Sequence, residues 1–177
     1  RVSSLMTVDL PEPVAPTIEV ASTRLLRGLA LDDLGRALAG VALATRPGGE
    51  RFTSAADGSF ALRLAAPAQS IVSDDARFAT VLAGAAGTTA DSGAIVVLAP
   101  RLQLAGHAFG AGGSALAGVE LQVELPRDFG SDFGLPLDGA LTLSWSAVSA
   151  ADGAFRLADV PAVSGARLSA HHGGYQP

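Results

Sequence analysis

The sequence predicts an all-β protein made of two tandem β-sandwiches, because the same blocks of residues occur twice in the same order. The heptapeptide SAADGSF returns almost unchanged as SAADGAF, and two further blocks flank it in both places. The paired blocks are 26–45 with 104–123, 54–60 with 149–155, and 70–80 with 167–177. Three blocks in one order indicate an internal duplication.

The glycines of the second copy favour strands over a helix. The first copy at 24–46 would by itself suit a helix, since it is rich in Ala, Leu and Arg. Its counterpart carries five glycines, each of which would cost a helix interior about 1 kcal/mol. They are Gly106, Gly110, Gly112, Gly113 and Gly118. Glycine turns between short strands suit both copies.

Short strands separated by turn signals are expected along the first copy, at a spacing typical of a β-sandwich. They are 25–31, 41–46, 51–54, 59–64, 70–73, 77–83 and 94–98. The Asp-Gly pairs at 57–58 and 152–153 suit hairpins, because both residue types tolerate the positive φ of a tight turn. We expect Phe60 and Phe155, which follow these turns, to be buried in equivalent cores.

The composition and charge exclude several classes of protein. The net charge is −5, and the arginines are scattered, whereas nucleic-acid binding needs a basic stripe. No apolar run approaches the roughly 20 residues that span a bilayer. The chain has no Cys, so it has no disulfide framework, no Cys metal site and no thiol nucleophile. It begins at Arg1 without a signal region, which indicates a processed or excised piece.

The repeated residues resemble the carboxypeptidase regulatory-like domain, a transthyretin-like (prealbumin-like) sandwich of the Ig-like kind. The shared pattern is two spaced glycines, Leu-Ala-Gly-Val, an Asp-Gly-x-Phe turn and a later aromatic residue. The matching positions are Gly28, Gly35, 38–41, 57–60 and Phe78 in the first copy, and Gly106, Gly113, 116–119, 152–155 and 173–175 in the second. The resemblance implies a non-catalytic module, usually in tandem, in secreted or surface-attached bacterial proteins.

One loop of the second copy carries a candidate contact site. The motif DFGSDFG at 128–134 contains the kinase tripeptide twice, but the chain has no Lys to pair a phosphate. Phe129 and Phe133, with the aspartates of this inserted loop, could form a partner contact or a calcium site. The alternative is that both rings fold back over the end of the sandwich. The spacing lacks the dense carboxylate ladder of a known calcium loop.

Neither a metal site nor a catalytic triad is expected. His171 and His172 are neighbours on a predicted strand, where successive side chains point to opposite faces. With His107 as the one other histidine and no Cys, we predict no metal and no cofactor. No Ser lies in a Gly-x-Ser-x-Gly elbow, and we predict that the protein is not an enzyme.

Trp145 and Tyr175 carry the alternative function, a carbohydrate-binding accessory module. Sugar-binding modules stack pyranose rings on exposed aromatic side chains, and these two residues are the candidates. Against this, a lone Trp is more often part of a core. A glycan is therefore the second partner class, after protein.

The segment 1–22 precedes the first sandwich (23–100), and the second sandwich (101–177) has no counterpart of the closing strand AIVVL. An open sandwich edge attracts a strand from another chain. The segment could therefore donate a strand to the second sandwich of the next copy, through Leu5, Met6, Val8 and Leu10. The alternative is that the chain is an excerpt of a longer array, with neighbouring domains as partners.

These observations predict a non-catalytic structural or interaction module of a secreted or cell-surface bacterial protein. If strand donation occurs, it joins two different surfaces, so copies would propagate head to tail into a filament.

Overall fold

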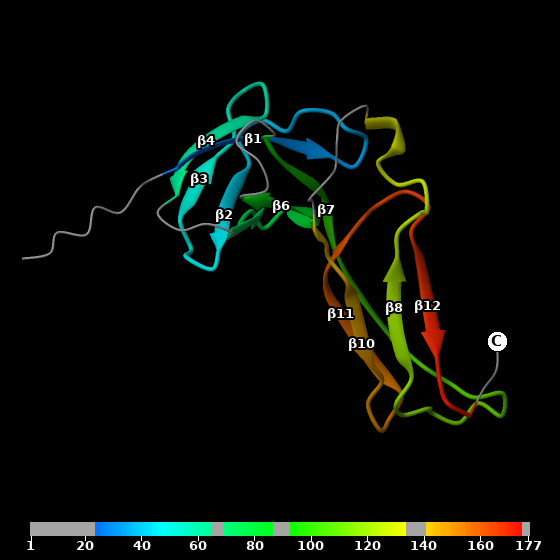
Figure 1. The fold of residues 1–177 in the computed structure, drawn as a ribbon. Helices are drawn as coiled ribbons and strands as arrows, with labels where there is room; N and C mark the ends of the chain where they lie inside the picture. The colour runs from blue at the N-terminus through cyan, green and yellow to red at the C-terminus, as the bar shows by residue number, and fades with distance from the viewer. Residues whose placement is uncertain (1–23, 65–68, 87–92, 134–140, 175–177) are drawn as a thin grey trace, which may run out of the picture.

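The computed structural model describes residues 24–64, 69–86, 93–133 and 141–174, and it is all-β over these ranges (Figure 1). The predicted fold class is confirmed at this level. The strands are β1 (Arg24–Asp32), β2 (Ala42–Arg46), β3 (Arg51–Thr53), β4 (Ser59–Leu64), β5 (Gln69–Ser73), β6 (Phe78–Ala86), β7 (Ala94–His107), β8 (Glu120–Glu124), β9 (Leu141–Thr142), β10 (Trp145–Val148), β11 (Ala154–Pro161) and β12 (Arg167–His171). A 3-10 turn, η1 (Ser131–Phe133), lies in the inserted loop.

The N-terminal half, residues 24–100, wraps into a nearly barrel-like sheet. Its strands are paired in the order β3-β2-β5-β6-β7-β1-β4, and the β1–β7 pair is parallel. Alternating apolar residues on these strands bury one cluster inside the sheet. The buried members are Leu26, Ala30, Val41, Leu43, Phe60, Leu62, Ile71, Ala94, Val96 and Leu98.

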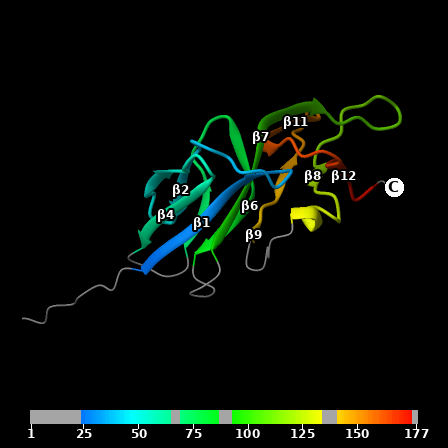
Figure 2. The same ribbon diagram turned by 90° about the horizontal axis from the view of Figure 1, so that it is seen from above.

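The C-terminal half, residues 101–174, begins inside β7. Where β7 continues past Pro100 it pairs with β11, and a separate three-stranded sheet has the order β10-β8-β12. The second buried cluster lies between these sheets and also takes in Val81, Leu82 and Val97 from the N-terminal half. The halves therefore lie side by side around β6 and β7 (Figure 2), and the predicted boundary at 100/101 falls within a continuous strand.

The same residue pairs face each other across neighbouring strands in both halves, at the positions that the sequence blocks share. Gly28 lies opposite Phe60 on the neighbouring strand, and Gly106 lies opposite Phe155. Each glycine makes room for the facing ring, since a Cβ on Gly28 would lie 2.3 Å from the Phe60 ring and one on Gly106 would lie 2.8 Å from the Phe155 ring. Gly28 lies within the predicted strand 25–31, and its role there is this close approach.

The two Asp-Gly turns carry the glycine at positive φ, as predicted, but they are not β-hairpins, because the strands on either side of each turn pair elsewhere. β3 pairs with β2 and β4 with β1, and in the C-terminal half β10 pairs with β8 and β11 with β7. Only the glycines adopt positive φ, 76° at Gly58 and 78° at Gly153. The Gly58 N–H donates to the Ala55 carbonyl at 3.0 Å, and the Ala55 N–H donates to the Ser59 carbonyl at 2.7 Å. This is a four-residue turn that closes on a left-handed glycine. Asp57 caps it by accepting the Ser59 N–H at 3.0 Å.

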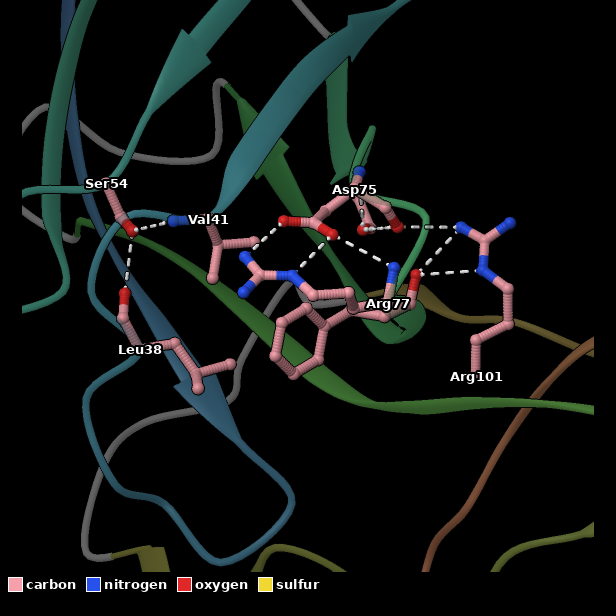
Figure 3. Close-up of polar contacts among 8 residues, drawn as sticks. Leu38, Val41, Ser54, Asp75, Arg77 and Arg101 are labelled. Atoms are coloured by element: carbon pink, nitrogen blue, oxygen red, sulfur yellow. Dashed lines mark hydrogen bonds and ion pairs between the residues drawn. The ribbon is translucent and has the colours of Figure 1, made fainter.

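A serine that the sequence blocks share ties each Asp-Gly turn to the loop that leads into β2 or β8. The Ser54 hydroxyl donates to the Leu38 carbonyl at 2.6 Å and accepts the Val41 N–H at 3.0 Å (Figure 3). Ser149 makes the same two bonds to Leu116 and Val119, at 2.7 and 2.9 Å. Both serines begin the repeated SAADG motif, so the repetition is the one signal of their role in the sequence.

Replacing Ser54 with Ala is expected to lower the free energy of unfolding by roughly 1–3 kcal/mol, because a buried N–H and carbonyl lose their partner. Thermal or urea unfolding measures the change. The control is Ser146→Ala, on an exposed position of β10, which should leave the stability nearly unchanged. Equal stability of the Ser54 and Ser146 variants would show that the hydroxyl of Ser54 contributes nothing.

Candidate functional site

An apolar groove of about 470 Å³ opens in the C-terminal half, between the end of β7 and strand β12. Its apolar lining comes from both sheets and includes Ala108, Leu116, Val119, Leu121, Phe155 and Leu168. β12 lies at the edge of the three-stranded sheet, and among the described strands it pairs with β8 alone. The groove is therefore bounded by two strand edges and floored by side chains of the core.

Every apolar lining residue named above has a counterpart in the closed core of the N-terminal half. The counterparts, by sequence block and by strand pairing, are Ala30, Leu38, Val41, Leu43, Phe60 and Ile71, in the same order. These six belong to the first cluster or pack against it. There β7 covers them with Ala94, Val96 and Leu98. The groove thus corresponds to the core of the N-terminal half, except that no described strand covers it as β7 does there.

The exposure of one edge residue agrees with the absence of a covering strand among the described residues. Ile71 is fully buried in the N-terminal half, whereas its counterpart Leu168 is 46% exposed. Leu168 shares a row of the sheet with Val123 and Trp145, which are 6% and 8% exposed. The core of the C-terminal half is therefore closed at β10 and β8 and open at β12.

The same opening corrects one prediction about the aromatic residues after the turns. Phe60 is buried, as predicted, with 6% of its surface exposed. Phe155 is only partly buried and lines the groove. Its position after the turn is equivalent, but no described strand covers its ring as β7 covers that of Phe60.

Arg101, on β7, links the two halves through its side chain. Its guanidinium donates to the Phe78 carbonyl at 2.8 Å and to the Asp75 carbonyl at 3.0 Å, both in the N-terminal half (Figure 3). It also pairs with Asp159 of β11 at 2.6 Å. Asp159 has a φ of 58° and lies at the irregularity in the β11–β7 pairing. One side chain therefore holds a hairpin of one half against a bulged strand of the other.

A second hollow, of about 580 Å³, lies beside this contact and has a polar lining. Arg46, Asp74, Arg101 and Asp159 contribute charged groups to it, and Trp145 borders it. Two of the aspartates are held in ion pairs, Asp74 with Arg51 at 2.8 Å and Asp159 with Arg101. These carboxylates act in holding strands and loops together.

Asp75 and Arg77 form an ion pair with two hydrogen bonds in the hairpin between β5 and β6. Hydrogen bonds from the Arg77 side chain, and then from its backbone N–H, lower the pKa of Asp75 to about 2. The shortest contact joins Arg77 Nη2 to Asp75 Oδ2 at 2.7 Å. The adjacent Arg77 guanidinium also lies over the Phe78 ring, 5.3 Å from its centroid.

Because the pKa of Asp75 is lowered, the pair stabilises the fold above the unfolded-state value of 3.8, and this contribution is lost as the pH falls toward 2. The free energy of unfolding of Asp75→Asn should therefore decline less steeply between pH 4 and pH 2 than that of the parent chain. Chemical unfolding at each pH measures this. Arg77→Ala should flatten the profile only in part, because the backbone N–H of residue 77 still donates to Asp75, and the double variant should match Asp75→Asn. Parallel profiles for parent and variants would contradict the assignment.

The predicted contact residues occupy different parts of the structure. Phe129 and Phe133 pack against each other edge to face, 5.6 Å apart, and against the second core cluster. Phe133 also lies 3.1 Å from the Cβ position of Gly35, in a turn of the N-terminal half. Trp145, on β10, is buried in the core of the C-terminal half. Tyr175 and the proposed strand residues Leu5, Met6, Val8 and Leu10 lie outside the described residues.

The histidines line the groove but form no metal centre among the described residues. His107, His171 and His172 border it from β7 and the end of β12. No group of three or more His, Asp or Glu side chains in the described ranges is placed to hold a metal ion. No helix in these ranges is long and apolar enough to cross a membrane.

Comparison with protein-family models, curated proteins and solved structures found no match. The arguments for function therefore rest on the geometry of this chain.

Proposed function

We propose that this chain is a non-catalytic structural module of a secreted or cell-surface bacterial protein, whose copies join head to tail. The observation that carries the proposal is β7, a single strand of 14 residues. Its first part runs parallel to β1 and closes the N-terminal half, and its second part pairs with β11 and opens the next half. A shared strand connects the halves without a flexible linker, which suits a protein that carries load along an array.

The charged side chains support a structural role. Asp32 accepts the Arg36 and Leu34 N–H groups of its turn and pairs with Arg36 at 2.7 Å. Asp75 and Arg101 hold the hairpin between β5 and β6, as described above. The resemblance to carboxypeptidase regulatory-like domains, and with it the proposal of two transthyretin-like sandwiches, agrees with this role and with an extracellular location.

The burial of Trp145 weakens the carbohydrate-binding alternative. At 8% exposure its ring offers little surface for stacking against a sugar. Tyr175 is the other aromatic candidate for that role, and it lies outside the described residues.

The test is the assembly state of the purified chain as a function of concentration. Sedimentation velocity should show a ladder of oligomers that lengthens with concentration, and negative-stain electron microscopy should show linear particles. A chain that stays monomeric at high concentration contradicts head-to-tail assembly. A glycan array separates the alternative: binding that is lost in Trp145→Ala would favour the carbohydrate module.

A further inference from the structure

We infer that the groove of the C-terminal half binds residues 4–21 of a second copy of the chain as two added β-strands. This inference rests on the proposed head-to-tail assembly and assigns its contact. The groove is the acceptor, the segment before β1 is the donor, and the pairing register follows from the repeat.

The pairing order of the N-terminal half contains two strands that have no described counterpart in the C-terminal half. In the N-terminal half, the pairing runs from β5 to β6, from β6 to β7 and from β7 to β1. The counterparts of β5 and β1 are β12 and the second part of β7. No described strand lies between these two. The vacancy therefore corresponds to the β6–β7 hairpin, with one strand antiparallel to β12 and one parallel to the end of β7.

The backbone at the end of β7 is oriented to accept such a strand. The Ala108 N–H donates to the Gly153 carbonyl at 2.8 Å, and the Ala108 carbonyl accepts the Leu116 N–H at 2.9 Å. Because backbone groups alternate in direction along a strand, the N–H and carbonyl groups of His107 and Phe109 point to the groove side. Leu29 and Leu31, their counterparts, lie beside β7 in the N-terminal half.

The donor segment contains two strand-like stretches in the required order. SLMTVDL at 4–10 and TIEVA at 17–21 are separated by the residues PEPVAP, whose prolines favour a turn, and β6 and β7 are likewise separated by residues 87–93. The repeat offset of 78 places Ile18 and Val20 on Val96 and Leu98, the residues that cover the first core. It places Thr17 and Glu19 on the other face of the strand. In this register the apolar side chains Ile18 and Val20 face the open core of the groove, as Val96 and Leu98 face the first core.

The donor must come from a second copy. Val20 is four residues before Arg24 and so lies at most about 14 Å from it. The start of β1 and strand β12 lie at opposite ends of the molecule in both views (Figure 1 and Figure 2). Because donor and acceptor surfaces differ, the contact repeats from copy to copy and leaves a free groove at one end of each assembly.

The inferred register places Ala108 beside Ile18 of the second copy, as Ala30 lies beside Val96. The chain has no Cys, so a pair of introduced cysteines reports on this contact alone. Full-length Ala108→Cys/Ile18→Cys should form a ladder of disulfide-linked oligomers on mild oxidation, since neighbouring strands bring Cα atoms within disulfide reach. Each single variant should give dimers at most. Ala108→Cys/Thr17→Cys, with the second thiol on the opposite face, should cross-link far less.

A substitution at the mouth of the groove tests the contact without cysteines. Leu168→Arg should abolish the concentration-dependent oligomers while the chain stays folded, because this side chain is already 46% exposed on an edge strand. Val148→Arg is the matched control, 62% exposed on the outer face of the same sheet, and should assemble like the parent. Circular dichroism and a melting curve check that both variants fold.

The outcomes separate this inference from the proposed function. Oligomers that persist in Leu168→Arg, with no disulfide between positions 18 and 108, would overturn the groove contact and leave head-to-tail assembly standing. A parent chain that is monomeric and gives no ladder in the double-cysteine variant overturns both. A synthetic peptide of residues 1–22 should suppress the ladder by competing for the groove, and a failure to compete at saturating concentration also counts against the contact.

Discussion

Truncation of Phe60 to Ala is expected to lower the free energy of unfolding by roughly 3–5 kcal/mol, enough to unfold a large fraction of a marginally stable protein. Phe60 is 6% exposed and belongs to the core of the N-terminal half. Its ring lies against Gly28 on the neighbouring strand and 5.3 Å from the Phe52 ring. Removing it leaves a cavity that these neighbours cannot fill. Urea unfolding followed by circular dichroism measures the loss.

Phe155→Ala is the matched variant in the C-terminal half. Its ring occupies the equivalent place over Gly106 but is only partly buried. The loss of stability should therefore be clearly smaller than for Phe60→Ala. If the groove is filled in an assembled form, the cost of Phe155→Ala should rise with protein concentration and that of Phe60→Ala should not. Equal losses at low concentration would mean that the groove is already covered in the single chain.

Gly58→Val is expected to destabilise the protein for two reasons that add. The residue has a φ of 76°, where a β-branched side chain costs about 1–3 kcal/mol. In addition, a Cβ at this position would lie 2.8 Å from the Ala30 carbonyl oxygen and 3.0 Å from the Ala37 Cβ. Backbone atoms of the core strand cannot move away cheaply. Thermal unfolding should show a lower melting temperature for this variant than for Gly40→Val, the control described next.

Gly40→Val separates the two causes. Gly40 also has a positive φ, 65°, but no atom lies within 4 Å of a Cβ built on it. This variant should show the conformational cost alone. Similar melting temperatures for the two variants would show that the contact of Gly58 with Ala30 contributes little.

The sequence by itself determined the all-β class and most strand positions. The strand at 59–64 is observed as predicted, and the others differ at their ends by a few residues, except that β7 is much longer. Alternating apolar residues and glycine turns are local signals, so they are readable in a single sequence. The positive φ of Gly58 and Gly153 followed from the same local chemistry.

The tertiary structure alone decided how the copies are joined and where the site lies. Nothing local in 94–107 distinguishes two strands from one, so the continuity of β7 emerged only from its pairing with β1 and β11. The shared serines became visible through hydrogen bonds between residues 13 or more positions apart. Phe60 and Phe155 follow the same motif, yet their burial differs, because burial depends on strands contributed from elsewhere in the chain. A single sequence records which residues are apolar, and only the packed structure records which of them remain uncovered.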